Sequence, residues 1–168
     1  MLVLPKARVL KMSVHVPLAG RVRVEAGRFR NDAGFIGLHG ISEFSAVHHC
    51  RTGNESEIIR RFDRAAAARR NVVRVFGMAQ NLFPLWLQQF GYWEAMDRAV
   101  QLAAERGLYT ELCLFPDAQL VMPSADDRRA LVMDFAQFCR AHETVIPQLA
   151  NEPGLNGWAD ATDLALLG

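Results

Sequence analysis

An asparagine and a glutamate end the last strongly apolar segment of the sequence. Asn151 and Glu152 directly follow the run Val145–Ala150, and Pro153 comes next. A short apolar run that stops at a proline is typical of a buried strand. A carboxylic acid at the end of such a strand can exchange a proton with a bound substrate. Glu152 is therefore the first candidate for a catalytic group.

A charged side chain interrupts a second apolar segment. Arg74 lies in the middle of Val72–Phe76, which otherwise contains only valine and phenylalanine. A buried guanidinium group is costly unless an anion meets it. Arg74 is thus a second candidate for a functional residue, and an arginine that reaches solvent from an edge strand is the structural alternative.

The run His48-His49-Cys50 contains three side chains that could bind a metal ion. Consecutive residues rarely point at one ion, and no second cluster in the sequence completes four ligands. We predict no metal site. The first predicted turn also lacks a glycine-rich phosphate-binding motif, so the sequence gives nucleotide binding little support and we predict no cofactor.

Composition limits the class of protein. The 168 residues are 51% hydrophobic and carry a formal net charge of +1, so one core can form and nothing favours nucleic acid or an anionic membrane as a partner. Lys6, Arg8 and Lys11 break up the apolar start of the chain, which excludes a secretory or membrane-spanning segment there. Three cysteines favour buried thiols, and we expect a cytoplasmic location by default.

The predicted elements alternate between strand and helix. An N-terminal arm, residues 1–34, contains a hairpin of 14–16 and 21–25 around Pro17 and Gly20. Capping boxes are predicted where Asn54 precedes Glu57 and where Ser124 precedes Asp127. The strands are predicted at 35–38, 72–76, 108–115 and 145–150, and the helices at 57–70, 93–106 and 124–142.

The spacing of these strands is regular. Phe35, Val72, Tyr109 and Val145 follow one another at intervals of 36 or 37 residues. Such βα units give parallel strands with right-handed connections, as in an open doubly wound sheet or a closed barrel. The fold class is therefore α/β.

Three segments together resemble the retaining glycoside hydrolases of clan A, of the cellulase and mannanase type close to family five. They are 37–42, Asn71 with Val72–Phe76, and 148–153 with the motif Asn-Glu-Pro. The resemblance covers roughly residues 29–158 and depends mostly on order and spacing. It implies that residues 35–168 are the N-terminal half of a (β/α)8 TIM barrel, an incomplete barrel of four units.

The resemblance also implies roles for three residues. Glu152 matches the general acid/base, which protonates the leaving glycosidic oxygen. Asn151 matches a residue that donates a hydrogen bond to the sugar hydroxyl beside the anomeric carbon. Arg74 matches an arginine that contacts the nucleophile, a glutamate on strand seven of the family. The structural alternatives are a turn residue for Asn151 and a helix-terminal carboxylate for Glu152.

Other side chains are candidates for sugar binding. Trp86 and Trp158, in or near predicted loops, could stack on a pyranose ring, although packing within a loop is the simpler explanation. His39, at a predicted strand end, could line a sugar subsite.

The resemblance stops short of a complete barrel. A TIM barrel typically takes about 250 residues and eight strands, whereas four units account for the 168 residues here. We expect the N-terminal half of a glycoside hydrolase that acts on β-linked glycosides, with the acid/base but without the nucleophile, and so inactive alone.

Two alternatives remain. A second copy or a complementary half-barrel could complete the site with Asp160, Asp163 or Glu43 as the other carboxylate. A non-enzymatic half-barrel could instead bind carbohydrate or serve a structural role. We predict an oligosaccharide or polysaccharide as ligand, and the unpaired sheet edges predict self-association or a complementary half-barrel as partner.

Overall fold

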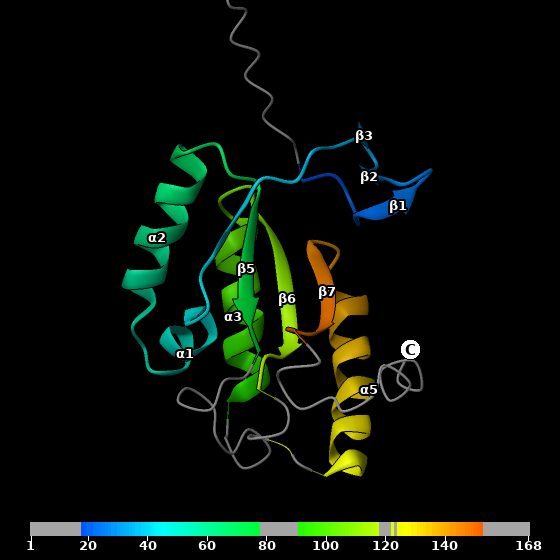
Figure 1. Ribbon diagram of the computed structural model, residues 1–168. Coiled ribbons are helices and arrows are strands. Elements are labelled where there is room, and N and C mark those ends of the chain that lie inside the picture. Colours follow the sequence, from blue (N-terminus) through cyan, green and yellow to red (C-terminus); the bar gives the residue numbers. More distant parts are fainter. Residues whose placement is uncertain (1–17, 78–90, 118–121, 123, 153–168) are drawn as a thin grey trace, which may run out of the picture.

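The computed structural model describes residues 18–77, 91–117, 122 and 124–152 of the chain. Two sheets and four helices are seen in these residues (Figure 1). The small antiparallel sheet at the top of the view contains β1 (Arg23–Glu25), β2 (Arg28–Asn31) and β3 (Gly34–Phe35). The parallel sheet below contains β4 (Gly40–Ser42), β5 (Val72–Phe76), β6 (Tyr109–Phe115) and β7 (Val145–Ala150), in that order.

The N-terminal sheet differs from the predicted hairpin. The strand predicted at 21–25 pairs forward with β2, with Val24 opposite Phe29. The turn lies at Ala26 and Gly27, which both have positive φ, at 49° and 71°. Glycine tolerates this left-handed conformation and so permits a tight turn there. The other predicted hairpin strand, 14–16, lies outside the described residues.

The parallel sheet confirms the α/β class and three of the four predicted strands. Val72–Phe76 and Val145–Ala150 have the predicted bounds, and β6 begins one residue later than predicted. The first strand was predicted at 35–38, which is wrong: Phe35 lies in β3, and Gly40 pairs with Val72 to start β4. Both segments are apolar and rich in glycine, so the sequence pattern did not distinguish them.

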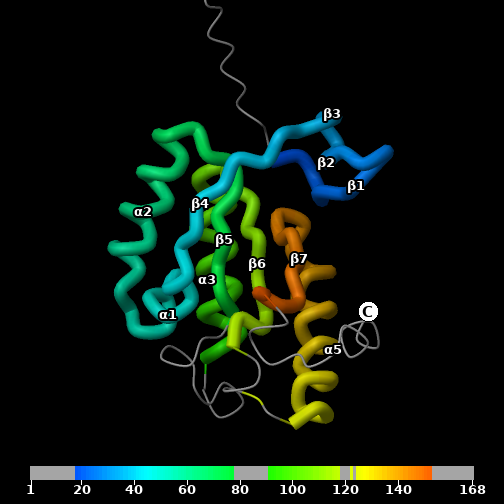
Figure 2. Tube along the Cα trace, in the orientation of Figure 1, coloured from blue at the N-terminus to red at the C-terminus, as the bar shows by residue number. Residues whose placement is uncertain are grey.

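The helices pack against the parallel sheet and follow its strands along the chain (Figures 1 and 2). They are α1 (Ala46–Arg51), α2 (Glu55–Ala67), α3 (Tyr92–Ala104) and α5 (Ala125–Ala141). The short α1 replaces a predicted loop. Ser124 caps α5 as predicted, by accepting from the Asp127 amide at 3.4 Å. The predicted capping box at Asn54 does not form: the Asn54 amide nitrogen lies 3.2 Å from His49 Nδ1, and Glu57 pairs with Arg60 and Arg61.

Alternation along the central strands separates an apolar face from a polar one. Val73 and Val75 of β5, with Leu112 and Leu114 of β6, are fully buried in the core shared with the helices. Arg74 alternates with the two valines and therefore points to the opposite face. No helix in the described ranges is long and apolar enough to cross a membrane.

Tyr109 fastens the N-terminal arm to the start of β6. Its hydroxyl accepts hydrogen bonds from the Asn31 amide at 2.9 Å and the Ala19 backbone at 3.1 Å, and it donates to the Gly20 carbonyl at 3.2 Å. Tyr109 and Asn31 are both fully buried. The small sheet thus lies at the amino ends of the parallel strands, and the carboxyl ends point to the opposite edge (Figure 1).

Candidate functional site

A polar cluster joins β5 to β7 at the carboxyl half of the parallel sheet. Arg74 donates to the Gln148 side-chain oxygen from Nε at 3.1 Å and from Nη2 at 2.7 Å. The same Nη2 donates to Asn151 Oδ1 at 3.0 Å. One guanidinium group therefore holds two amide side chains that lie 74 and 77 residues away in sequence. In parallel α/β folds, this edge is where ligands bind.

The Arg74 guanidinium is paired with an anionic side chain, as expected for a charge within an apolar strand. Glu111 lies directly opposite Arg74 in the register of β5 and β6, and its Oε1 is 3.5 Å from Arg74 Nε. The Arg74 side chain is 26% exposed. The alternative of an edge arginine is therefore wrong, because β5 is an inner strand and the guanidinium is paired with Gln148, Asn151 and Glu111.

The bond from Arg74 fixes which way the Asn151 amide points. Arginine only donates, so Asn151 Oδ1 must face it and the NH2 group must point away. Asn151 Nδ2 then lies 3.5 Å from a Glu152 carboxylate oxygen. The cluster thus places a hydrogen-bond donor beside a carboxylate, which together can bind a hydroxyl group and exchange a proton.

Glu152 is exposed and has an unusual backbone conformation. Its φ is +41°, in the left-handed region that side chains other than glycine rarely adopt. Such strain is often found at functional sites, because the surrounding structure fixes a side chain in a required direction. The strand end therefore sets the position of Glu152 at a cost in backbone energy.

An aromatic pair flanks the cluster on the β4 side. The rings of Phe44, just after β4, and Phe76, the last residue of β5, are stacked with centroids 4.0 Å apart. Directly before Phe44 in sequence, Glu43 is held by Arg61 of α2 at 3.0 Å. Gln148, Phe44 and Phe76 are not among the residues that the sequence predicted for the site. Strand alternation could have found Gln148, but only with the register known.

The structure does not bring His39 to this edge. His39 precedes β4, and its backbone is paired with Asn71, the residue before β5, through bonds of 3.0 and 2.7 Å. It therefore lies at the amino ends of the strands, opposite Asn151, because β4 begins five residues later than predicted. Trp86 and Trp158 lie outside the described residues.

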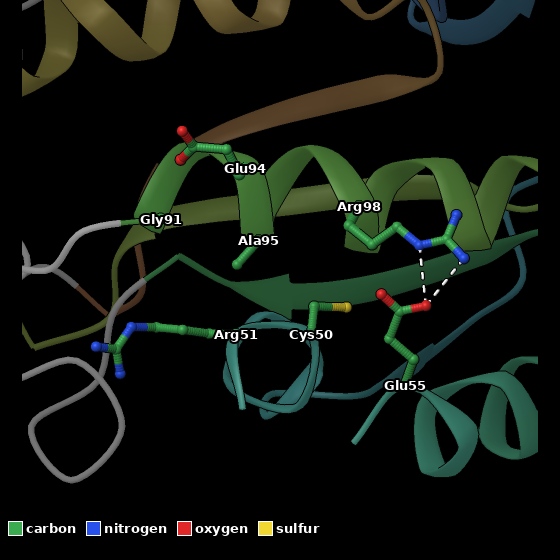
Figure 3. A pocket seen from close by; sticks show the side chains of 7 residues that line it. All are labelled: Cys50, Arg51, Glu55, Gly91, Glu94, Ala95 and Arg98. Atoms are coloured by element: carbon green, nitrogen blue, oxygen red, sulfur yellow. Dashed lines mark hydrogen bonds and ion pairs between the residues drawn. The ribbon is translucent and has the colours of Figure 1, made fainter. Parts of the chain in front are cut away.

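A shallow pocket in the helical layer offers less chemistry. It lies between α1 and α3 (Figure 3), has a volume of about 330 Å3, and its charged Glu55 and Arg98 are paired at 2.9 Å. Burial raises the pKa of the Cys50 thiol in its wall to about 11. A thiol with that pKa stays protonated at neutral pH and is a poor nucleophile. The pocket therefore contains no activated group.

Comparison with solved structures finds the same fold in glycoside hydrolases. An exo-β-1,4-mannosidase from Opitutaceae bacterium strain TAV5 matches 86% of this chain with a TM-score of 0.69 and 17% identity. A family 5 glycoside hydrolase from Bacteroides vulgatus matches 88%, with a TM-score of 0.60 and 18% identity. The endoglucanase catalytic domain from Thermobifida fusca, solved in complex with cellotetraose, matches 80%, with a TM-score of 0.55 and 20% identity.

The likeness covers only part of these proteins. The chain spans 31%, 36% and 43% of the mannosidase, the Bacteroides hydrolase and the endoglucanase domain, respectively. No protein-family model and no curated protein sequence matches it. The four parallel strands therefore have the fold of a partial TIM barrel, similar to part of the barrel in these glycoside hydrolases.

Proposed function

We propose that this chain supplies the acid/base half of a retaining glycoside hydrolase site that acts on β-linked glycosides. The observation that carries the proposal is the bond from Arg74 to Asn151. It unites two residues that were predicted separately, on strands two and four of the half-barrel, at the edge where barrel enzymes bind substrate. The similarity in fold to family 5 enzymes supports the same assignment.

In this proposal, Glu152 in its protonated form lies beside the glycosidic oxygen. It gives its proton to that oxygen as the bond to the anomeric carbon breaks, and positive charge develops on the sugar ring. Asn151 donates from Nδ2 to the neighbouring sugar hydroxyl, a contact that strengthens as the charge develops. Arg74 is a positioning residue, because it acts on the substrate through Asn151.

A retaining mechanism needs a second carboxylate about 5 Å from the acid, on the other side of the sugar. Two of the carboxylates near this edge are already paired, Glu111 with Arg74 and Glu43 with Arg61. We therefore assign the nucleophile to a part of the barrel beyond these four strands. The isolated chain is then expected to bind β-linked sugars and to hydrolyse none of them.

The test is to measure binding and hydrolysis with the same protein. Calorimetry or NMR titration with β-1,4-linked gluco- and manno-oligosaccharides is expected to detect binding that Asn151→Ala weakens. Without an added nucleophile, aryl β-glycosides are expected to remain intact. Hydrolysis that depends on Glu152 would favour a site completed by a second copy. Sugar binding that is unchanged by replacement of Asn151 or Glu152 would favour the carbohydrate-binding half-barrel.

Sedimentation over a range of concentrations tests the expected partner. The four-stranded sheet has open edges at β4 and β7, which favour association with another copy or with a complementary half-barrel. A chain that stays monomeric at all concentrations would exclude closure by a second copy.

A further inference from the structure

The aromatic pair beside the polar cluster has no role in the proton transfer described above. Phe44 and Phe76 stack with an angle of 18° between their rings, and Phe44 remains 44% exposed. Phe76 therefore supports one face of Phe44 and holds the ring at the surface. A flat, supported and exposed apolar ring is a suitable surface for stacking on the C–H face of a sugar.

The pair is continuous with the cluster that includes Asn151. The Arg74 guanidinium lies 5.6 Å from the centre of the Phe76 ring. Phe76, Cys113 and Gln148 also occupy one register level across β5, β6 and β7. The aromatic and polar residues thus form one surface that runs across the sheet from β4 to β7.

The width of this surface limits the ligand. Neighbouring strands lie about 4.8 Å apart, so three spacings separate the end of β4 from the end of β7 by about 14 Å. A pyranose unit in a β-1,4-linked chain is about as long as one strand spacing. A sugar on Phe44 is therefore a different unit from the one held by Asn151, with about two units between them.

We propose that Phe44, supported by Phe76, binds a pyranose unit about three positions along the chain from the unit beside the bond that Glu152 protonates. A ligand that fills the whole site is then a chain of at least four β-linked sugars, and a disaccharide at Asn151 does not reach Phe44. This inference rests on the proposed function, because it places the scissile bond at Glu152. It adds a binding subsite and a minimum chain length.

The test compares ligands of two and four units. NMR titration or calorimetry with cellobiose and cellotetraose, and with the corresponding manno-oligosaccharides, is carried out on the full chain and on Phe44→Ala. The expected loss of tetrasaccharide affinity is about five- to tenfold, which is the usual strength of one stacking contact. The disaccharide affinity is expected to stay the same. Phe44→Trp keeps a flat ring and should restore the preference for the longer chain.

Phe35 provides a matched control. It is 46% exposed, close to the value for Phe44, but it lies in β3 of the N-terminal sheet. Phe35→Ala should leave both affinities unchanged, and equal losses in the two variants would overturn the inference. If Phe44→Ala has no effect while Asn151→Ala weakens binding, the subsite is wrong and the proposed function stands. If no oligosaccharide binds, both are wrong.

Discussion

Arg74 donates a hydrogen bond of 3.0 Å to Asn151, 77 residues further along the chain. The bond joins an inner strand to the end of β7 and fixes the direction of the Asn151 amide. The same guanidinium group holds Gln148 and pairs with Glu111. A single side chain thus connects three of the four parallel strands on their polar face.

Replacement of Arg74 should destabilise the protein and disorder the Asn151 amide. We expect Arg74→Met to cost about 1 to 2 kcal/mol, because two amides lose a donor and Glu111 loses its partner. Urea unfolding measures this cost. Arg60→Met is the control, since Arg60 makes an exposed pair with Glu57 that solvent screens and that should contribute little to stability. If Arg74→Met and Arg60→Met lowered the free energy of unfolding by the same small amount, the central role of Arg74 would be contradicted.

Replacement of Glu152 by glycine should stabilise the chain relative to alanine. The φ of +41° is strained for alanine but not for glycine, so we expect a difference of about 1 kcal/mol in the free energy of unfolding. Glu143, exposed in the turn before β7 and with no positive φ, is the control. There, glycine should be no more stable than alanine. If glycine also gave a more stable protein than alanine at position 143, the difference at position 152 would not be evidence of backbone strain.

Removal of the Tyr109 hydroxyl should loosen the N-terminal arm. Tyr109→Phe leaves the buried Asn31 amide without its acceptor, so we expect a loss of about 1 to 3 kcal/mol. Hydrogen exchange should become faster in residues 19–32 and remain unchanged in α3. Unchanged exchange in the arm would mean that other contacts hold it.

Stability should fall at alkaline pH. Burial raises the pKa of Cys113 to about 12 and that of Cys139 to about 11, whereas thiols in an unfolded chain titrate near about 8.5. The unfolded chain therefore loses these protons first as the pH rises. The stability that the two protonated thiols contribute is fully present below a pH of about 8 and is lost as the pH rises from about 9 to about 12. Urea midpoints at pH 7, 9 and 10.5 measure the decline.

A cysteine variant tests the cause of that decline. Cys113→Ala should show a shallower fall in stability between pH 9 and 10.5 than the unchanged chain, whatever its stability at pH 7. Parallel curves would exclude the Cys113 thiol as the source.

The sequence was sufficient to predict the bounds of a strand where other residue types mark both of its ends. Val145–Ala150 lies between a helix and Asn151, and its predicted bounds are those of β7. The segment around Phe35 has a similar apolar pattern, but it pairs with the arm, and only tertiary contacts decide between the two sheets. The six-residue α1 is too short to give a helical period.

The candidate site was predicted in part for a related reason. Arg74 was recognised by its charge within an apolar strand, and Asn151 and Glu152 by their place at a strand end. Glu111 and Gln148 became partners of Arg74 only through the register of three strands, which the sequence does not specify. His39 was misplaced together with its strand.

Trapping of the sugar by azide tests the role of Glu152 most directly. In a site without its own nucleophile, azide can form the C1–N bond from the α face of an aryl β-glycoside while Glu152 protonates the departing phenolate. We predict an α-glycosyl azide from a phenyl glycoside, formed at least about 100-fold more slowly by Glu152→Gln. A dinitrophenyl leaving group, which needs little protonation, should reduce that difference. Equal rates for both proteins with the phenyl glycoside would contradict the assignment of Glu152 as the acid.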